Sequence, residues 1–316
     1  MRPRIVVTPG DPRGIGPEVM LRALEIFRGE DPELEVTLMG PSGELDPDGV
    51  KELVGRAQRG PAGDARAGEV AARSIERAVE LALRGDAHAL VTAPLHKPSL
   101  QSAGWEVPGQ TELLRDLCGA ARVGMLMAAE RTRLDAPLRV LLATTHIPLR
   151  SVPAAVTEDL LTDQIDLLDG ALRTDWGIAS PKIALCGLNP HASDAGLFGD
   201  EERAVFEPAI VRARESGMRI EGPLPADTVF SRALNGHFDA VVAPYHDVGM
   251  AAFKTVSFGT GVNVTIGLPF VRTSPDHGTA FDIAGMDRAD PTSMLEALRL
   301  AHALAAKRFD IASAAV

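Results

Sequence analysis

The sequence predicts an α/β fold with a mostly parallel sheet covered by helices. Strand-like apolar runs alternate along the chain with segments in which apolar residues recur every three or four positions. Such alternation is typical of strands joined by helical crossovers. Because 316 residues exceed the usual size of one domain, we expect two lobes.

The predicted strands are short apolar runs, and the predicted helices lie between them. The strands are expected at residues 5–8, 36–39, 89–92, 139–145, 183–188, 240–243 and 262–266. The helices are expected at residues 17–27, 69–83, 157–172, 201–215 and 293–307. Residues 43–63, rich in Pro, Gly, Asp and Glu, are expected to form a mobile surface excursion, and the Ala-rich C-terminal tail is expected to fray.

Composition and charge restrict the function. A formal net charge of -11 argues against binding to the nucleic-acid backbone, which requires a basic face. The apolar stretches are too short for a signal peptide or a membrane span, so we expect a cytoplasmic protein with no membrane partner. Cys118 and Cys186 match no metal or redox spacing and are expected to be buried free thiols without a role.

Three histidines follow three predicted strands. Residues 139–146, 183–191 and 240–246 are apolar runs that end in His146, His191 and His246. Ligands of open α/β sheets bind beyond the carboxyl ends of the strands, so these side chains are expected at one functional edge. Three imidazoles suit a catalytic Zn²⁺ site with one open position, whereas the alternative is that each is a polar residue leaving the core. Asp247 and Asp194 follow closely and are candidates to orient such ligands.

A glycine-rich loop follows the first predicted strand. Gly14 and Gly16 lie in residues 8–19, where Pro17 suits the first turn of a helix. The spacing differs from the dinucleotide-binding GxGxxG pattern, and any tight turn from strand to helix requires glycine. The loop is therefore open to a binding or a purely structural interpretation.

Basic and amide side chains surround a second glycine-rich segment, residues 258–272. Lys254, Asn263 and Arg272 supply a point charge, an amide and a two-pronged donor, which together suit a phosphate or a carboxylate. The alternative is a set of scattered surface charges.

Together the motifs resemble one family, 4-hydroxythreonine-4-phosphate dehydrogenase, over nearly the whole chain. The matching stretches are residues 8–18, 92–97, 109–112, 188–192, 222–228, 245–247 and 261–280. The resemblance implies that His146, His191 and His246 bind a divalent metal, with ligands shared across a homodimer whose active site lies at the interface. Zinc is the expected metal, and Mg²⁺, Mn²⁺ and Co²⁺ are alternatives. The resemblance also implies a substrate site formed by Gln110, Thr111, Lys254, Asn263 and Arg272.

A second resemblance concerns the cofactor. Residues 276–285 are similar to the adenosine-binding loop of isocitrate and isopropylmalate dehydrogenases, and Gly14 and Gly16 match their N-terminal signature. The likeness implies that His277 and Gly278 lie near the adenine. Asp282 would accept a hydrogen bond from the ribose, which favours NAD over NADP because a carboxylate repels the extra phosphate.

The same likeness implies a two-lobed isocitrate/isopropylmalate dehydrogenase-like fold with mostly parallel sheets and an active-site cleft between the lobes. Residues 1–130 with 270–316 would form a cofactor-associated lobe. Residues 131–269 would form the metal, substrate and dimerisation lobe.

The activity that the family implies is an NAD- and metal-dependent oxidation, with decarboxylation, of 4-phosphohydroxy-L-threonine to 3-amino-2-oxopropyl phosphate in pyridoxine 5'-phosphate biosynthesis. The small phosphorylated hydroxy acid and the second protomer are then the expected partners. Asp227, Asp247 and Lys97 are candidates for the general base.

One position departs from the family, because Gln110 stands where a histidine is usual. Glutamine forms hydrogen bonds but carries no proton or charge near neutral pH. The departure leaves open a sister activity on erythronate or threonate 4-phosphate or on a dihydrodiol carboxylate. It also predicts that a histidine restored at position 110 tightens substrate binding below about pH 6.5. A transferase-like or non-catalytic protein is the third alternative, and the retention of three histidines together with Asp282 argues against it.

Overall fold

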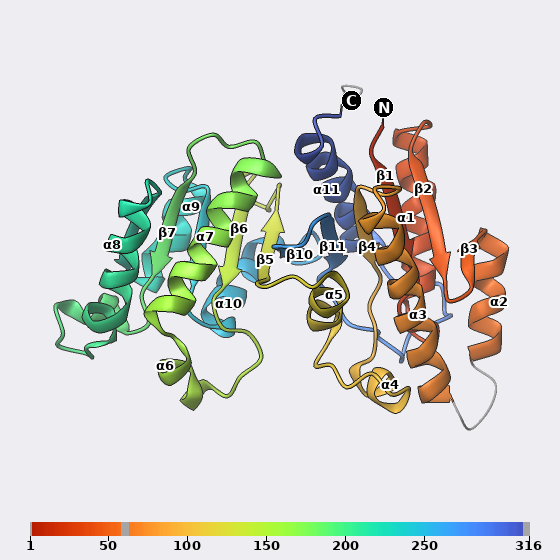
Figure 1. The fold of residues 1–316 in the computed structure, drawn as a ribbon, viewed down its shortest axis with the longest axis horizontal. Helices are drawn as coiled ribbons and strands as arrows, with labels where there is room; N and C mark the ends of the chain where they lie inside the picture. Colours follow the sequence, from red (N-terminus) through yellow and green to blue (C-terminus); the bar gives the residue numbers. More distant parts are fainter. Residues whose placement is uncertain (1, 58–62, 312–316) are drawn as a thin grey trace. The chain divides into compact units, whose positions relative to one another are not determined.

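The computed structural model describes residues 2–57 and 63–311. The chain forms two compact units, Met1–Ala121 with Leu268–Val316, and Arg122–Gly267. Figure 1 shows how the first unit combines both ends of the chain, since the red and orange N-terminal elements lie beside the dark-blue C-terminal ones. The predicted α/β class with a mostly parallel sheet is confirmed. The expected fraying of the tail concerns residues 312–316, which lie outside the described part of the chain.

In its described residues, the first unit contains five strands in the order β3-β2-β1-β4-β11. The strands are β1 (Arg4–Thr8), β2 (Glu35–Gly40), β3 (Gly43–Leu45), β4 (Ala89–Thr92) and β11 (Val271–Pro275). All pairs are parallel except β2 with β3. The residues of β4 and β11 are buried throughout, as expected for strands covered on both faces.

Six helices accompany this sheet in the part of the unit that the structure describes. They are α1 (Gly16–Glu30), α2 (Pro47–Ala57), α3 (Gly63–Leu83), α4 (Lys97–Ser102), α5 (Gln110–Cys118) and α11 (Thr292–Arg308). Helix α11 packs on β11, β4 and α1, whereas α3 packs against β1, β2 and β4. Since β1 lies between β2 and β4, right-handed crossovers place α1 and α3 on opposite faces.

The second unit contains six strands in the order β10-β5-β6-β9-β7-β8. The strands are β5 (Gly124–Ala129), β6 (Leu138–Leu142), β7 (Lys182–Cys186), β8 (Arg219–Leu224), β9 (Ala240–Ala243) and β10 (Val262–Ile266). β5 runs antiparallel to β10 and β6, and the other pairs are parallel.

The helices of the second unit are mostly short. The α-helices are α6 (Val152–Ala155), α7 (Glu158–Thr174), α8 (Glu207–Glu215), α9 (Ala226–Leu234) and α10 (His246–Ser257). Two 3₁₀ turns, η1 (Leu149–Ser151) and η2 (Pro190–Asp194), and a π-helical turn, η3 (Glu202–Phe206), complete the unit. Phe253 of α10 is fully buried among residues of β6 and β9. Such burial contributes roughly 1.5–3 kcal/mol per large apolar side chain.

The expected surface excursion at residues 43–63 is wrong for residues 43–57, and its residues 58–62 lie outside the described part of the chain. It contains β3 and α2 instead. Asp46 Oδ1 accepts a hydrogen bond from the Gly49 amide at 2.7 Å, and Pro47 begins the helix. An Asp-Pro pair is a helix-start signal, and the richness in Pro, Gly and acidic residues concealed it.

Within the described residues, no helix is both long and apolar enough to cross a membrane. Cys118 is half-buried and Cys186 is buried, both as free thiols. Burial raises the pKa of Cys118 to about 11, so this thiol remains protonated and unreactive near neutral pH.

Candidate active site

His146 and His246 lie side by side in the second unit. His146 follows β6 and His246 begins α10 directly after β9. β6 and β9 are parallel neighbours, so their carboxyl ends bring the two side chains to one edge of the sheet. The ring centroids are 5.5 Å apart, and both residues line a pocket of about 150 Å³.

A carboxylate orients one of these rings. Asp247 Oδ1 accepts a hydrogen bond from His246 Nδ1 at 2.8 Å. This bond fixes the tautomer and leaves Nε2 without a proton, which is the form of imidazole that a metal ion requires. The donors present at this pocket therefore fit a borderline divalent ion such as Zn²⁺.

His191 does not join the other two histidines. It opens a run of five residues with left-handed φ angles, residues 191–195, and its ring lies 6.3 Å from that of Phe198. In the part of the chain that the structure describes, no three His, Cys, Asp or Glu side chains converge to hold a metal ion. One chain thus brings together two of the three predicted ligands.

A buried carboxylate holds the loop that leads to His191. Glu202 is only 1% exposed and accepts hydrogen bonds from the backbone amides of Leu188 at 2.9 Å and Asn189 at 2.7 Å. Its other oxygen accepts from Asn189 Nδ2 at 2.8 Å. These charge-assisted bonds offset the cost of burying the carboxylate. Sequence reasoning missed Glu202 because its partners are mostly backbone groups, which leave no pattern in the sequence.

The other predicted residues of the second unit lie on three elements. Asp227 is in the first turn of α9, Lys254 in the last turn of α10, and Asn263 on β10. Burial, and then the charges of Glu202 and Asp227, raise the pKa of the Cys186 thiol to about 12, so Asp227 lies near the end of β7. Asn263 Oδ1 is buried and has no hydrogen-bond partner within the described chain. Such an acceptor is a group that a bound ligand can satisfy.

In the first unit, Arg272 and Gln110 form a polar cluster with Thr92. Arg272 on β11 is 2% exposed, and burial lowers its pKa to about 10, which still leaves it charged near pH 7. The guanidinium donates to Thr92 Oγ1 at 2.6 Å and to Gln110 Oε1. Thr92 in turn donates to Gln110 Oε1 at 2.7 Å, and Gln110 Nε2 donates to the carbonyl of Ala93 at 3.0 Å.

Lys97 and Thr111 lie close to this cluster. Thr111 follows Gln110 in the first turn of α5, and Lys97 begins α4. The Lys97 side chain runs beside Gly109, where an added Cβ would lie 3.4 Å from Lys97 Cε. Three separate segments of the first unit, α4, α5 and β11, therefore bring together Lys97, Gln110, Thr111 and Arg272. Thr92 was missed as part of this group, although it stands at the carboxyl end of a predicted strand.

The glycine-rich loop, residues 8–19, contacts the segment formed by residues 276–285. The Ile15 amide donates to the carbonyl of Thr279 at 2.9 Å. A Cβ at Gly14 would lie 2.7 Å from that same oxygen, and a Cβ at Gly16 would lie 2.5 Å from the carbonyl oxygen of Pro9. Gly14 is thus required where two segments approach closely, and Gly16 where the helix begins.

The segment 276–285 carries a buried hydrogen-bond acceptor. His277 Nδ1 lies 3.0 Å from the carbonyl oxygen of Gly278, so Nδ1 carries the proton and Nε2 is an acceptor. Nε2 is buried and finds no partner in the described chain. Asp282 is exposed, and its neighbour Phe281 packs against the guanidinium of Arg13, 5.3 Å from the ring centroid.

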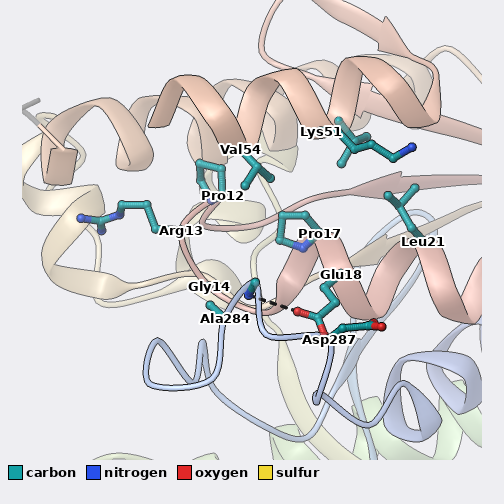
Figure 2. A pocket seen from close by; sticks show the side chains of 12 residues that line it. Pro12, Arg13, Gly14, Pro17, Glu18, Leu21, Lys51, Val54, Ala284 and Asp287 are labelled. Atoms are coloured by element: carbon teal, nitrogen blue, oxygen red, sulfur yellow. Dashed lines mark hydrogen bonds between the residues drawn. The ribbon is translucent and has the colours of Figure 1, made fainter. Parts of the chain in front are cut away.

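Beside this segment lies a pocket of about 280 Å³ (Figure 2). Its walls come from the glycine loop, α1, α2 and the turn at residues 284–287. Figure 2 shows Pro12, Val54 and Pro17 on the apolar side and Glu18 beside the turn. Sequence reasoning missed Glu18 as a site residue, although it belongs to the motif at residues 8–18.

Comparison with known proteins identifies relatives over almost the full length. Residues 41–301 match the model of the family described as pyridoxal phosphate biosynthetic protein PdxA. The chain is 43% identical over 321 residues to 4-hydroxythreonine-4-phosphate dehydrogenase of Paracoccus denitrificans, covering 96% of this chain and 98% of the relative. It is 42% identical over 322 residues to the enzyme of the same name from Burkholderia vietnamiensis, with coverage of 96% and 97%.

Solved structures of dehydrogenases show the same fold. A 4-hydroxythreonine-4-phosphate dehydrogenase from Klebsiella pneumoniae is 36% identical with a TM-score of 0.80, covering 96% of this chain and 98% of that one. A terephthalate 1,2-cis-dihydrodiol dehydrogenase from Burkholderia xenovorans is 26% identical with a TM-score of 0.66, covering 96% and 98%. Isocitrate dehydrogenase from Methylococcus capsulatus, 16% identical with a TM-score of 0.52 and coverage of 98% and 86%, shows the same fold. The chain therefore belongs to the PdxA family of pyridoxal phosphate biosynthetic proteins and is an oxidoreductase acting on a CH–OH group.

Proposed function

We propose that the protein oxidises and decarboxylates 4-phosphohydroxy-L-threonine to 3-amino-2-oxopropyl phosphate, with NAD as hydride acceptor and a divalent metal, in pyridoxine 5'-phosphate biosynthesis. The observation that carries the proposal is the His146–His246 pair at two parallel strand ends, with Asp247 bonded to His246. The names of the relatives supply the substrate.

His246 and His146 would hold the metal, and Asp247 would keep His246 Nε2 directed to it. When bound, the metal acts as a Lewis acid that lowers the pKa of the substrate alcohol and stabilises negative charge during loss of CO₂. Zinc fits the imidazole donors best, and Mg²⁺, Mn²⁺ and Co²⁺ are the alternatives.

The third ligand would come from a second protomer. His191 stands on an outward turn next to Leu197 and Phe198, whose exposed fractions of 71% and 46% are high for large apolar side chains. Such a patch supports contact with another chain. A homodimer would place His191 of one protomer beside His146 and His246 of the other, which agrees with the separation of the three residues in one chain.

The substrate would be held by polar and cationic side chains. Asn263 offers a buried, unpartnered oxygen, and Lys254 offers a point charge for the phosphate. Arg272, held by Thr92 and Gln110, places a permanent positive charge behind Gln110 and Thr111. That charge would favour an anionic substrate even without direct contact.

The cofactor would bind along residues 276–285. His277 Nε2 would accept a hydrogen bond from the adenine amino group, and Asp282 would accept from the ribose 2'-hydroxyl, which favours NAD. NAD would take the hydride from the substrate carbon. The general base is one of Asp227, Asp247 and Lys97; the bond between Asp247 and His246 suits orientation of the histidine more than proton abstraction.

A second candidate substrate is a dihydrodiol carboxylate or an erythronate or threonate 4-phosphate. Two observations favour it, namely Gln110 in place of a histidine and the structural likeness to the terephthalate dihydrodiol dehydrogenase. Both candidates share the oxidation of a CH–OH group and differ in the groups around it.

The test is formation of NADH by the purified protein after removal of metal with a chelator and after restoration of Zn²⁺, Mg²⁺, Mn²⁺ or Co²⁺. We expect NADH, CO₂ and 3-amino-2-oxopropyl phosphate in equal amounts only with a metal restored. NADH formation that is unaffected by chelation would refute the metal-dependent mechanism.

A further inference from the structure

Glu18 links the glycine loop to the far end of the cofactor-like segment. It lies in the first turn of α1. Its Oε2 accepts a hydrogen bond from the Gly285 amide at 3.2 Å, which Figure 2 shows as a dashed line, and its Oε1 accepts from the Ala289 amide at 3.3 Å. One carboxylate therefore holds two amides that are about one turn apart in the chain.

The segment it holds has little regular structure of its own. Residues 281–287 form turns and the rest of residues 276–290 has no helix or strand. The internal backbone bonds include those from the Ile283 amide to Ala280 and from the Met286 amide to Ile283. Ala280 and Asp287 have positive φ angles of 41° and 56°, which cost energy for residues other than glycine. Such a segment keeps one conformation only if groups outside it fix it.

Three residues hold the segment from outside, namely Ile15, just before α1, and Glu18 and Arg22 within α1. The Ile15 amide binds the carbonyl of Thr279 at 2.9 Å, and Arg22 donates to the carbonyl of Ala289 at 3.2 Å. Glu18 acts between them and accepts from two backbone amides, and its bonds, like that of Arg22, involve a charged group. Asp282 lies between the Thr279 and Gly285 attachments, and His277 lies two residues before the first of them.

We infer that Glu18 is a positioning residue for the dinucleotide: it fixes residues 276–289 in the conformation that presents His277 and Asp282. The inference rests on the proposed function, in which this segment binds NAD. A loop that is already ordered pays less conformational entropy on binding, so Glu18 raises affinity without touching the cofactor.

The test compares Glu18→Ala, which removes both acceptors, with Glu18→Gln, which retains one acceptor oxygen. Glu25→Gln, at an exposed position on the same helix, is the matched control. The first readout is amide hydrogen exchange of residues 278–289 in the protein without NAD. The others are the Kd for NAD by calorimetry and the kinetic constants.

We expect faster exchange of this segment in Glu18→Ala while the exchange of β6 and β9 is unchanged, which separates a local effect from general unfolding. The Kd and KM for NAD should rise about tenfold in Glu18→Ala and about threefold in Glu18→Gln, as expected for loss of two bonds and of one. The kcat and the KM for the phosphorylated substrate should stay within about twofold of wild type, as should every value for Glu25→Gln.

Unchanged exchange in Glu18→Ala would overturn the inference, because Glu18 would not hold the segment. Faster exchange with an unchanged Kd for NAD would also overturn it, because the segment would not position the cofactor. If Glu18→Ala does not fold, the same two criteria apply to Glu18→Gln. Wild-type protein that binds no NAD would refute the proposed function itself, and the inference with it.

Discussion

The side-chain oxygen of Gln110 accepts a hydrogen bond from the buried guanidinium of Arg272. Position 110 is thus in direct contact with a positive charge that is 2% exposed. An imidazolium at this position would be disfavoured both by burial and by the like charge of Arg272. The expectation that a histidine here becomes protonated near pH 6.5 therefore has to be revised to a lower pH.

For Gln110→His we now predict an imidazole pKa below 6.5, measured by NMR with labelled histidine. Substrate binding should then show no tightening between pH 7 and about pH 6. The folded pKa is lower than the unfolded one, so the variant should lose stability relative to wild type as the pH falls through about 6.5. A measured pKa at or above 6.5 would show that Arg272 does not control this position.

Asp247→Asn should weaken binding of Zn²⁺ or Co²⁺ to the chelated protein by about 10–100-fold, because an amide orients His246 less firmly than a carboxylate. Calorimetric titration measures this effect directly. Asp159→Asn removes a carboxylate with the same exposed fraction, 87%, from α7 and should leave metal affinity unchanged. Equal affinities for the two variants would exclude Asp247 from the metal site.

Asp282→Ser should raise the KM for NAD and narrow the preference for NAD over NADP, because the proposed hydrogen bond to the ribose and the repulsion of a 2'-phosphate disappear together. The ratio of kcat/KM for the two cofactors is the measurement. Asp86→Ser, at an exposed turn, provides the control. An unaltered ratio would remove Asp282 from the cofactor site.

A buried histidine, His88, and a partly buried one, His302, make stability depend on pH. The pKa of His88 is lowered chiefly by burial and then by Arg4. The pKa of His302 is lowered chiefly by burial, against the opposing charge of Asp31 and with a smaller contribution from Arg2. Above pH 6.5 both are neutral in either state, but as the pH falls below 6.5 the unfolded chain binds protons that the folded chain does not. The free energy of unfolding should therefore fall with pH in this range.

His88→Asn should make that fall shallower, because the amide does not titrate in this range. Asn can still accept the hydrogen bond that His88 Nδ1 receives from the Arg4 amide at 2.9 Å. Urea unfolding at several values between pH 7.5 and 5.5 measures the slope, with His237→Asn at an exposed position as the control. A slope equal to that of wild type would mean that His88 does not contribute.

The sequence predicted the fold well where strands are apolar and helices amphipathic. All seven predicted strands and all five predicted helices are present, within a few residues of their expected limits. β5, β8 and β11 were missed because they carry Met and Ala, a Gly-Pro pair, or polar residues such as Arg272 that are nevertheless buried. Burial of a polar strand depends on partners distant in sequence, and no local pattern reveals them.

The site was predictable only in part, for a similar reason. Strand ends and motifs pointed to His146 and His246, which the structure brings together. The separation of His191 depends on a left-handed turn of five residues, which nothing in His-Ala-Ser-Asp-Ala predicts. The supports of the site, Glu202 and Glu18, bind backbone amides, and such contacts are set by the fold as a whole.

The central claim is tested most directly by kcat/KM of the metal-loaded protein with NAD on 4-phosphohydroxy-L-threonine and on erythronate 4-phosphate, measured side by side from initial rates of NADH formation. The proposal predicts a kcat/KM at least about tenfold higher on the first, corresponding to about 1.4 kcal/mol of additional transition-state stabilisation. No oxidation of the first together with rapid oxidation of the second would contradict the vitamin B6 assignment and establish the sister activity.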